Sequence, residues 1–184
     1  MNILGISCFY HDSAAALIQN GRITAAAQEE RFNRIKNSGA FPLNAIDFCL
    51  KTGNISACDL DYIVFFEKPF LKFARVINDH LQCWPFSLKH FVRSMPSWLG
   101  ERLVLDDSIR HELGYKGKVL YIKHHLSHAA SAFFASPFEE AAILTIDGVG
   151  EWASLSCGEG RGRIVIKAGN PENIHRLGLP QACV

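Results

Sequence analysis

The chain has 184 residues, a formal net charge of +1 and 48% hydrophobic residues, and no block of Lys or Arg stands out. This composition favours a folded protein over a disordered one and argues against a nucleic-acid partner. Residues 1–7 lack the features of a signal peptide, no apolar run reaches the roughly 20 residues of a membrane span, and the six cysteines are scattered without C-x-x-C spacing. We therefore expect a cytoplasmic protein with no membrane partner.

The first 28 residues predict three antiparallel strands. Apolar runs at 2–6, 14–19 and 22–28 are typical of strands, and Asn20-Gly21 is a strong hairpin signal. The first turn, SCFYHDS, offers backbone N–H groups that can form an anion-binding concavity. It also carries His11, which can act as an acid or base near neutral pH, although a turn histidine is more often simply exposed.

The next segment is rich in charge of both signs. Residues 29–36, EERFNRIK, are typical of a solvated face. Because the run leaves a strand and precedes a loop at Gly39, it can instead reach over a pocket, with Lys36 holding a phosphate as a point charge. Pro42 and Gly53 bracket an amphipathic helix over 42–51, and 62–66 predicts a buried strand.

Residues 67–114 predict a helical insertion that covers one edge of the sheet. Helices are expected at 70–82, 88–94 and 99–113, and the segment is rich in aromatic side chains. Those aromatics are most simply core residues, with a substrate groove as the alternative.

Residues 118–151 predict a strand, a helix over 124–134 that stops at Ser136-Pro137, and a second strand over 141–146. His124 and His128 are four residues apart and so share one helix face, while His125 points elsewhere. Asp147 follows the second strand at its carboxyl end, where α/β sheets place their ligands. Two imidazoles and a carboxylate suit Fe(II), Mn(II) or Zn(II); ordinary surface histidines and an Asp-Gly turn are the alternative.

After Glu151, residues 152–158 and 162–168 alternate around a Gly-Glu-Gly-Arg-Gly turn and predict a new hairpin. The strand that ends in Asp-Gly-x-Gly and enters this hairpin looks like the second of two phosphate-binding turns. The opening meander is therefore expected to begin again here.

Four stretches resemble the carbamoyltransferases of nodulation and antibiotic biosynthesis: NILGISCFYHDSAAAL, AAAQEERFNRIKN, FPLNAIDFCL and HHLSHAASAFFASPFEEAAILTIDGVGEWAS. The resemblance implies an α/β domain of the actin-like ATPase (ribonuclease-H-like) fold, with a mixed sheet and helices. It also implies a carbamoyl-adenylate made from carbamoyl phosphate and ATP. The carbamoyl group then passes to a hydroxyl of a small-molecule acceptor.

The resemblance also implies roles for particular residues. His11 matches a catalytic histidine, and Lys36 matches a basic residue near carbamoyl phosphate. The metal ligands match His124, His128 and Asp147, with Fe(II) the first expectation and Zn or Mn the alternatives. The turn that meets the nucleotide phosphates matches Gly148, Gly150 and Glu151.

The family's enzymes are several times longer than this chain. Residues 1–170 are expected to be the first part of their N-terminal domain, with 171–184 a divergent, truncated tail. We expect the chain alone not to be a competent carbamoyltransferase. The alternatives are an inactive remnant, a split subunit that needs a second chain carrying the missing half, and a protein like those that transfer threonylcarbamoyl to tRNA.

Overall fold

The computed structural model describes residues 1–148, 154–162 and 164–167. The chain divides into two compact units, Met1–Ile122 and Lys123–Val184. Each unit is described by itself.

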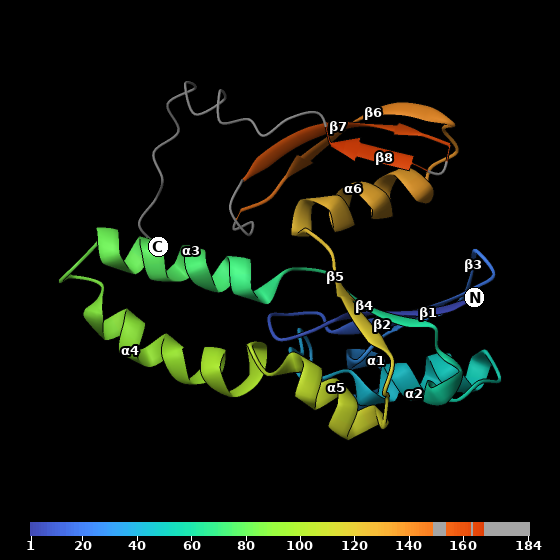
Figure 1. Cartoon of the computed structure of the whole chain (residues 1–184), viewed down its shortest axis with the longest axis horizontal. Coiled ribbons are helices and arrows are strands. Elements are labelled where there is room, and N and C mark those ends of the chain that lie inside the picture. The colour runs from blue at the N-terminus through green and yellow to red at the C-terminus, as the bar shows by residue number, and fades with distance from the viewer. Residues whose placement is uncertain (149–153, 163, 168–184) are drawn as a thin grey trace. The chain divides into compact units, whose positions relative to one another are not determined.

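The first unit is built on a five-stranded mixed sheet with strand order β3-β2-β1-β4-β5 (Figure 1). Its strands are β1 (Asn2–Ser7), β2 (Ala14–Gln19), β3 (Arg22–Gln28), β4 (Tyr62–Phe65) and β5 (Lys118–Tyr121). The first three strands pair antiparallel, whereas β4 runs parallel to both β1 and β5. This arrangement is an α/β fold and agrees with the actin-like class that the sequence resembles.

The opening hairpin follows its turn chemistry. Asn20 and Gly21 both adopt positive φ, at 51° and 80°, as a two-residue turn of type I′ requires. The alternating small and apolar residues of β2 place Ala15 and Leu17 in the core. The predicted three-stranded meander is confirmed.

The first unit also contains several helices and helical turns. They are α1 (Glu30–Asn33), α2 (Leu43–Thr52), the 3₁₀ turn η1 (Ala57–Asp59), α3 (Pro69–Gln82), α4 (Leu88–Ser97), the π-helical turn η2 (Trp98–Arg102) and α5 (Leu105–Leu113). Ile46 of α2 and Ile109 of α5 join the same buried cluster as Leu4 and Ile63 of the sheet. The Tyr121 hydroxyl donates a hydrogen bond to Asp106, which ties α5 to the edge strand β5.

The predicted helix over 99–113 is interrupted. The structure has the π-helical turn η2 first, and α5 begins only at Leu105. Gly100 lies within this turn and disfavours a regular α-helix there.

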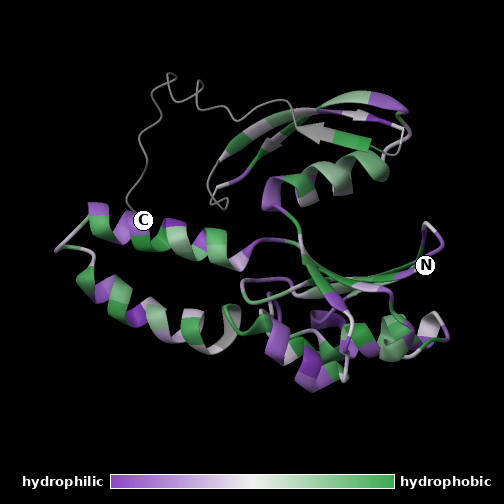
Figure 2. Ribbon diagram, in the orientation of Figure 1, coloured by the Kyte–Doolittle hydropathy of each residue, from purple (hydrophilic) through white to green (hydrophobic). Residues whose placement is uncertain are grey.

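The second unit packs α6 (His124–Phe134) on a three-stranded antiparallel sheet of β6 (Glu140–Ile146), β7 (Leu155–Arg161) and β8 (Ile164–Lys167). Ala129 and Phe133 of the helix bury against Ile143 of β6. Figure 2 shows a hydrophilic first turn of α6 followed by a mostly hydrophobic remainder. A second antiparallel meander is confirmed, and the helix has the predicted bounds.

The turn of this second meander was predicted in the wrong place. Residues 158–161 lie within strand β7, and the turn follows at Gly162, which has φ 55°. Gly160 serves a close approach instead of a turn, because a Cβ added there would lie 2.5 Å from the Phe133 ring of α6. Within the described residues, no helix has the length and apolar character needed to cross a bilayer.

Candidate metal centre and first turn

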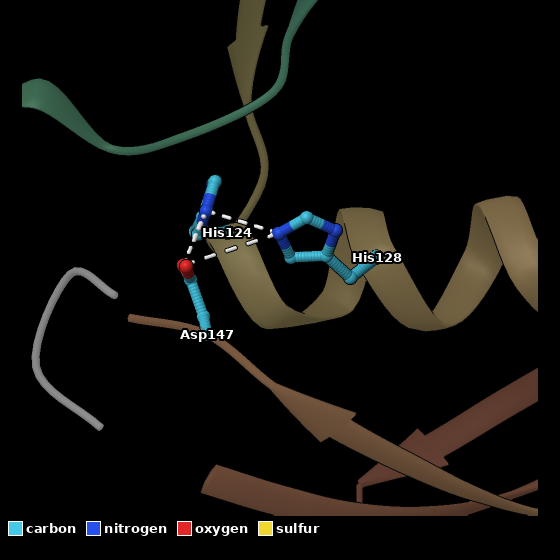
Figure 3. A group of neighbouring side chains, drawn as sticks. All are labelled: His124, His128 and Asp147. Carbon is cyan, nitrogen blue, oxygen red and sulfur yellow. Dashed lines mark hydrogen bonds and ion pairs between the residues drawn. The ribbon is translucent and has the colours of Figure 1, made fainter. Parts of the chain in front are cut away.

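The second unit brings three potential metal ligands together, His124, His128 and Asp147 (Figure 3). Nε2 of His124 lies 2.8 Å from Asp147 Oδ2 and 3.1 Å from Nε2 of His128. Nε2 of His128 lies 4.0 Å from the same carboxylate oxygen. Two imidazole nitrogens and one carboxylate oxygen thus converge on one point.

Local structure explains the convergence. A spacing of four residues puts both histidines on one face of α6, at its first two turns. The sheet ladder continues one step past β6, since the Asp147 N–H donates to the Ser154 carbonyl at 2.9 Å. This bond fixes the backbone of Asp147 at the strand end, and the carboxylate lies beside His124 in the first turn of the helix.

The three residues fit a divalent transition metal. Metal–ligand bonds of about 2.0–2.1 Å separate neighbouring ligand atoms by roughly 3 Å, close to the spacing seen for His124. The His124 side chain is 12% exposed and that of His128 51%, so one side of the group is open to solvent and to a further ligand. Without an ion, the same atoms can make an ion pair between a protonated imidazole and the carboxylate.

The predicted nucleotide turn is described only in part. Gly148 is exposed, and a Cβ built on it meets nothing within 4 Å. The packing of the described residues therefore does not require a glycine there. Gly150 and Glu151 lie outside the described residues.

In the first unit, the turn that carries His11 is paired with the loop that follows Lys36. Phe9 N–H donates to the Gly39 carbonyl and Ser13 N–H to the Ser38 carbonyl, both at 2.8 Å. A Cβ on Gly39 would lie 2.8 Å from the Tyr10 carbonyl oxygen, so only glycine fits this approach. The two segments that the sequence singled out separately are thus neighbours.

The turn itself is unusual in its backbone. Phe9 and Asp12 have positive φ, at 75° and 53°, a conformation that side-chain-bearing residues seldom adopt. Nδ1 of His11 lies 2.8 Å from Asp12 Oδ2, and both side chains reach solvent. Lys36 is exposed on the neighbouring loop.

Buried charged side chains occur at two places in the first unit where the sequence does not predict them. The charge pattern of residues 29–36 predicts a solvated face, yet Glu29 is buried and accepts hydrogen bonds from Asn44 Nδ2 at 2.5 Å and from the Ala45 N–H at 2.9 Å. Its carboxylate therefore caps α2. Asn44 and Ala45 lie 15 and 16 residues further along the chain, so no local pattern in the sequence predicts this cap.

The second group is a buried ion pair. Lys72 Nζ lies 2.9 Å from Glu67 Oε2 and 3.7 Å from the centre of the Tyr10 ring. Tyr10 precedes His11, and its ring also meets Phe66 edge-on. The pair thus supports the first turn. Glu67 and Lys72 are close in the sequence, but the contact of Lys72 with Tyr10 joins segments far apart in the chain, so no local pattern predicts it.

The comparisons with known proteins bear on the whole chain. A family model described as the carbamoyltransferase N-terminus matches residues 2–177. An uncharacterized protein of Synechocystis sp. is 46% identical over 186 residues, covering 97% of this chain and 30% of the relative. Nodulation protein NolNO of Sinorhizobium fredii is 38% identical over 157 residues, covering 83% of this chain and 22% of the relative.

Further matches are more distant. Nodulation protein U of Rhizobium tropici is 30% identical over 148 residues, with 77% of this chain and 24% of the relative covered. Among solved structures, YeaZ from Pseudomonas aeruginosa aligns with a TM-score of 0.46 at 11% identity, over 92% of this chain and 65% of that chain. The chain spans less than a third of the length of these three curated relatives. The match of the family model over residues 2–177 shows that the chain belongs to the carbamoyltransferase family and corresponds to its N-terminal part.

Proposed function

We propose that this chain supplies the metal centre and the first-turn histidine of an ATP-dependent O-carbamoyltransferase. The reaction would pass a carbamoyl group from carbamoyl phosphate, through a carbamoyl-adenylate, to a hydroxyl of a small molecule. The observation that carries the proposal is the convergence of His124, His128 and Asp147 in a chain of this family. Fe(II) is the first candidate for the ion, with Zn(II) and Mn(II) as alternatives.

The three converging residues would hold the ion on the open side of the second unit. A bound divalent ion supplies a Lewis acid for phosphate oxygens and so stabilises charge on the leaving group. Asp147 neutralises part of the ion's charge, and the two imidazoles bind in their neutral form. Gly148, which has open space around its Cβ position, would let a nucleotide phosphate approach the backbone, and Gly150 and Glu151 would complete that turn.

His11 would act as the base. With its Nδ1–H donating to Asp12, the imidazole is held as the tautomer whose Nε2 bears the lone pair. That nitrogen would take the proton of the acceptor hydroxyl as the carbamoyl group is transferred. Lys36, on the loop paired with this turn, would bind the phosphate of carbamoyl phosphate as a point charge.

We further propose that the whole activity needs the part of the relatives' sequence that this chain does not span. One face of the second unit's sheet supports this, because Leu144 and Ile146 are 64% and 75% exposed there. Apolar residues gathered on one sheet face are typical of a surface that another segment covers.

The test is an assay of carbamoyl transfer from labelled carbamoyl phosphate to a panel of hydroxyl compounds. The purified chain is assayed alone and together with the remaining part of the Synechocystis relative. We expect no transfer by the chain alone, ATP-dependent transfer by the mixture, and loss of transfer with His11→Ala but not with His111→Ala, an exposed histidine of α5. Equal transfer by the His11→Ala mixture, or transfer without ATP, would contradict the proposal.

A further inference from the structure

Next to the candidate metal ligands, a third histidine of α6 forms hydrogen bonds to the sheet. Nδ1 of His125 lies 2.9 Å from Thr145 Oγ1 and 2.9 Å from Ser156 Oγ. The two hydroxyl oxygens lie 2.5 Å apart, and Thr145 Oγ1 also donates to the Ser156 carbonyl at 3.2 Å. All three side chains are buried. They form a polar triad between the helix and two strands of the second unit.

The triad and the metal ligands occupy the same stretch of the sheet. Thr145 of β6 faces Ser156 of β7 directly in the antiparallel ladder. Asp147 lies two residues beyond Thr145, on the same face of the strand, and its N–H continues the ladder to Ser154. On the helix side, His125 is the immediate neighbour of His124. Thus the first turn of α6 and the end of β6 carry both the metal ligands and the hydrogen bonds of the triad.

We propose that His125 is a positioning residue for the metal centre. Its bonds to Thr145 and Ser156 fix the rotation and height of the first turn of α6 against β6. That placement brings His124 and His128 to Asp147. This inference rests on the proposed metal-binding function and adds to it the part of the fold that holds the ligands in register.

The hydrogen bonds of His125 favour a role in positioning the metal ligands over a role as a core-packing residue. Apolar packing, such as that of Phe133 on Gly160 near the other end of α6, keeps the helix close to the sheet but allows small slides and rotations. A buried hydrogen bond is directional and penalises any placement that leaves its groups unpaired. Groups behind metal ligands typically need to hold them within about 0.5 Å of the productive geometry.

The test compares zinc affinity, by competition with a chromophoric chelator, and stability, by urea unfolding, in the full chain. His125→Leu removes the triad's imidazole, and His125→Asn retains a polar nitrogen close to the position of Nδ1. A triple variant, His125→Leu with Thr145→Val and Ser156→Ala, removes all the triad's polar groups together. His111→Leu, the same exchange at an exposed histidine of the first unit, is the matched control.

We expect His125→Leu to bind zinc about tenfold or more weaker than wild type. His125→Asn should recover part of the loss, and the control should not differ from wild type. The triple variant should regain stability, because it leaves no buried hydroxyl unpaired, yet its zinc affinity should stay low. The absorption spectrum of bound cobalt(II) should change in His125→Leu and in the triple variant, which a role in stability alone would not produce.

Wild-type zinc affinity in His125→Leu would overturn the inference, as would a triple variant that regains both stability and affinity. If His125→Leu does not fold, the asparagine and triple variants still decide between the outcomes. A folded wild-type chain that binds no zinc or cobalt would be a different result, since it would overturn the proposed metal centre itself.

Discussion

Phe133 of α6 lies directly against Gly160 of β7. A Cβ built on Gly160 would come within 2.5–2.6 Å of three atoms of the Phe133 ring, well inside van der Waals contact. The glycine in the strand is therefore the residue that lets the helix approach the sheet.

We predict that Gly160→Ala destabilises the fold by about 1–3 kcal/mol, because the buried ring or the helix must move to make room. Urea unfolding measures the change. Gly100→Ala is the matched control, since a Cβ there meets nothing within 4 Å, and it should leave stability nearly unchanged. If the two variants were equally stable, Phe133 would not lie in close contact with Gly160 in solution.

The carboxylate of Glu29 should be important to the first unit although it belongs to a highly charged run. Glu29→Ala removes the acceptor for Asn44 and for the Ala45 N–H at the start of α2. We expect a loss of about 1–3 kcal/mol in the free energy of unfolding. Glu112→Ala, at a partly exposed glutamate of α5, should cost far less. A similar cost at both positions would rule out the capping role.

Glu67 and Lys72 should depend strongly on each other. Lys72→Met leaves a buried carboxylate without its cation, which typically costs about 3 kcal/mol or more. Glu67→Met together with Lys72→Met should be less destabilised than either single variant, and a double-mutant cycle by urea unfolding measures the coupling. Additive effects would mean that the two groups do not interact in solution.

Stability should fall at alkaline pH because of Tyr121. Burial, with a further contribution from Asp106, raises the pKa of this phenol well above its ordinary value of 10.0. The unfolded chain then loses the proton at a lower pH than the folded chain does, so the stabilisation is complete below pH 10 and declines as pH rises above it. Tyr121→Phe should be less stable at pH 8 but lose less stability between pH 9 and pH 11. An unchanged slope would contradict the raised pKa.

Local patterns predicted much of this fold. The helix over 124–134, the Asn20-Gly21 hairpin and the apolar strands follow from spacing and turn chemistry that operate within a few residues. The same local logic misplaced the turn near Gly160, where a glycine run looked like a bend but serves a contact with α6. Glycine is suited both to a turn and to the close approach of another element, and only the tertiary packing decides which of the two occurs.

Local sequence patterns predicted the metal ligands of the candidate site but not the contacts that support them. The spacing of His124 and His128 and the strand-end position of Asp147 were readable, and the structure brings them together. The roles of His11 and Lys36 came from family resemblance, and they stay predictions. The supporting contacts, such as the triad of His125, depend on which strands become neighbours, and one sequence read alone does not specify that.

We propose that His124, His128 and Asp147 of the second unit bind a metal ion. The most direct test is elemental analysis of the purified, folded chain for wild type, His128→Ala and the control His111→Ala. We predict roughly one iron, zinc or manganese ion per chain in wild type and control, and its loss in His128→Ala. A folded wild-type chain without a bound ion, or a His128→Ala variant that retains it, would contradict the account.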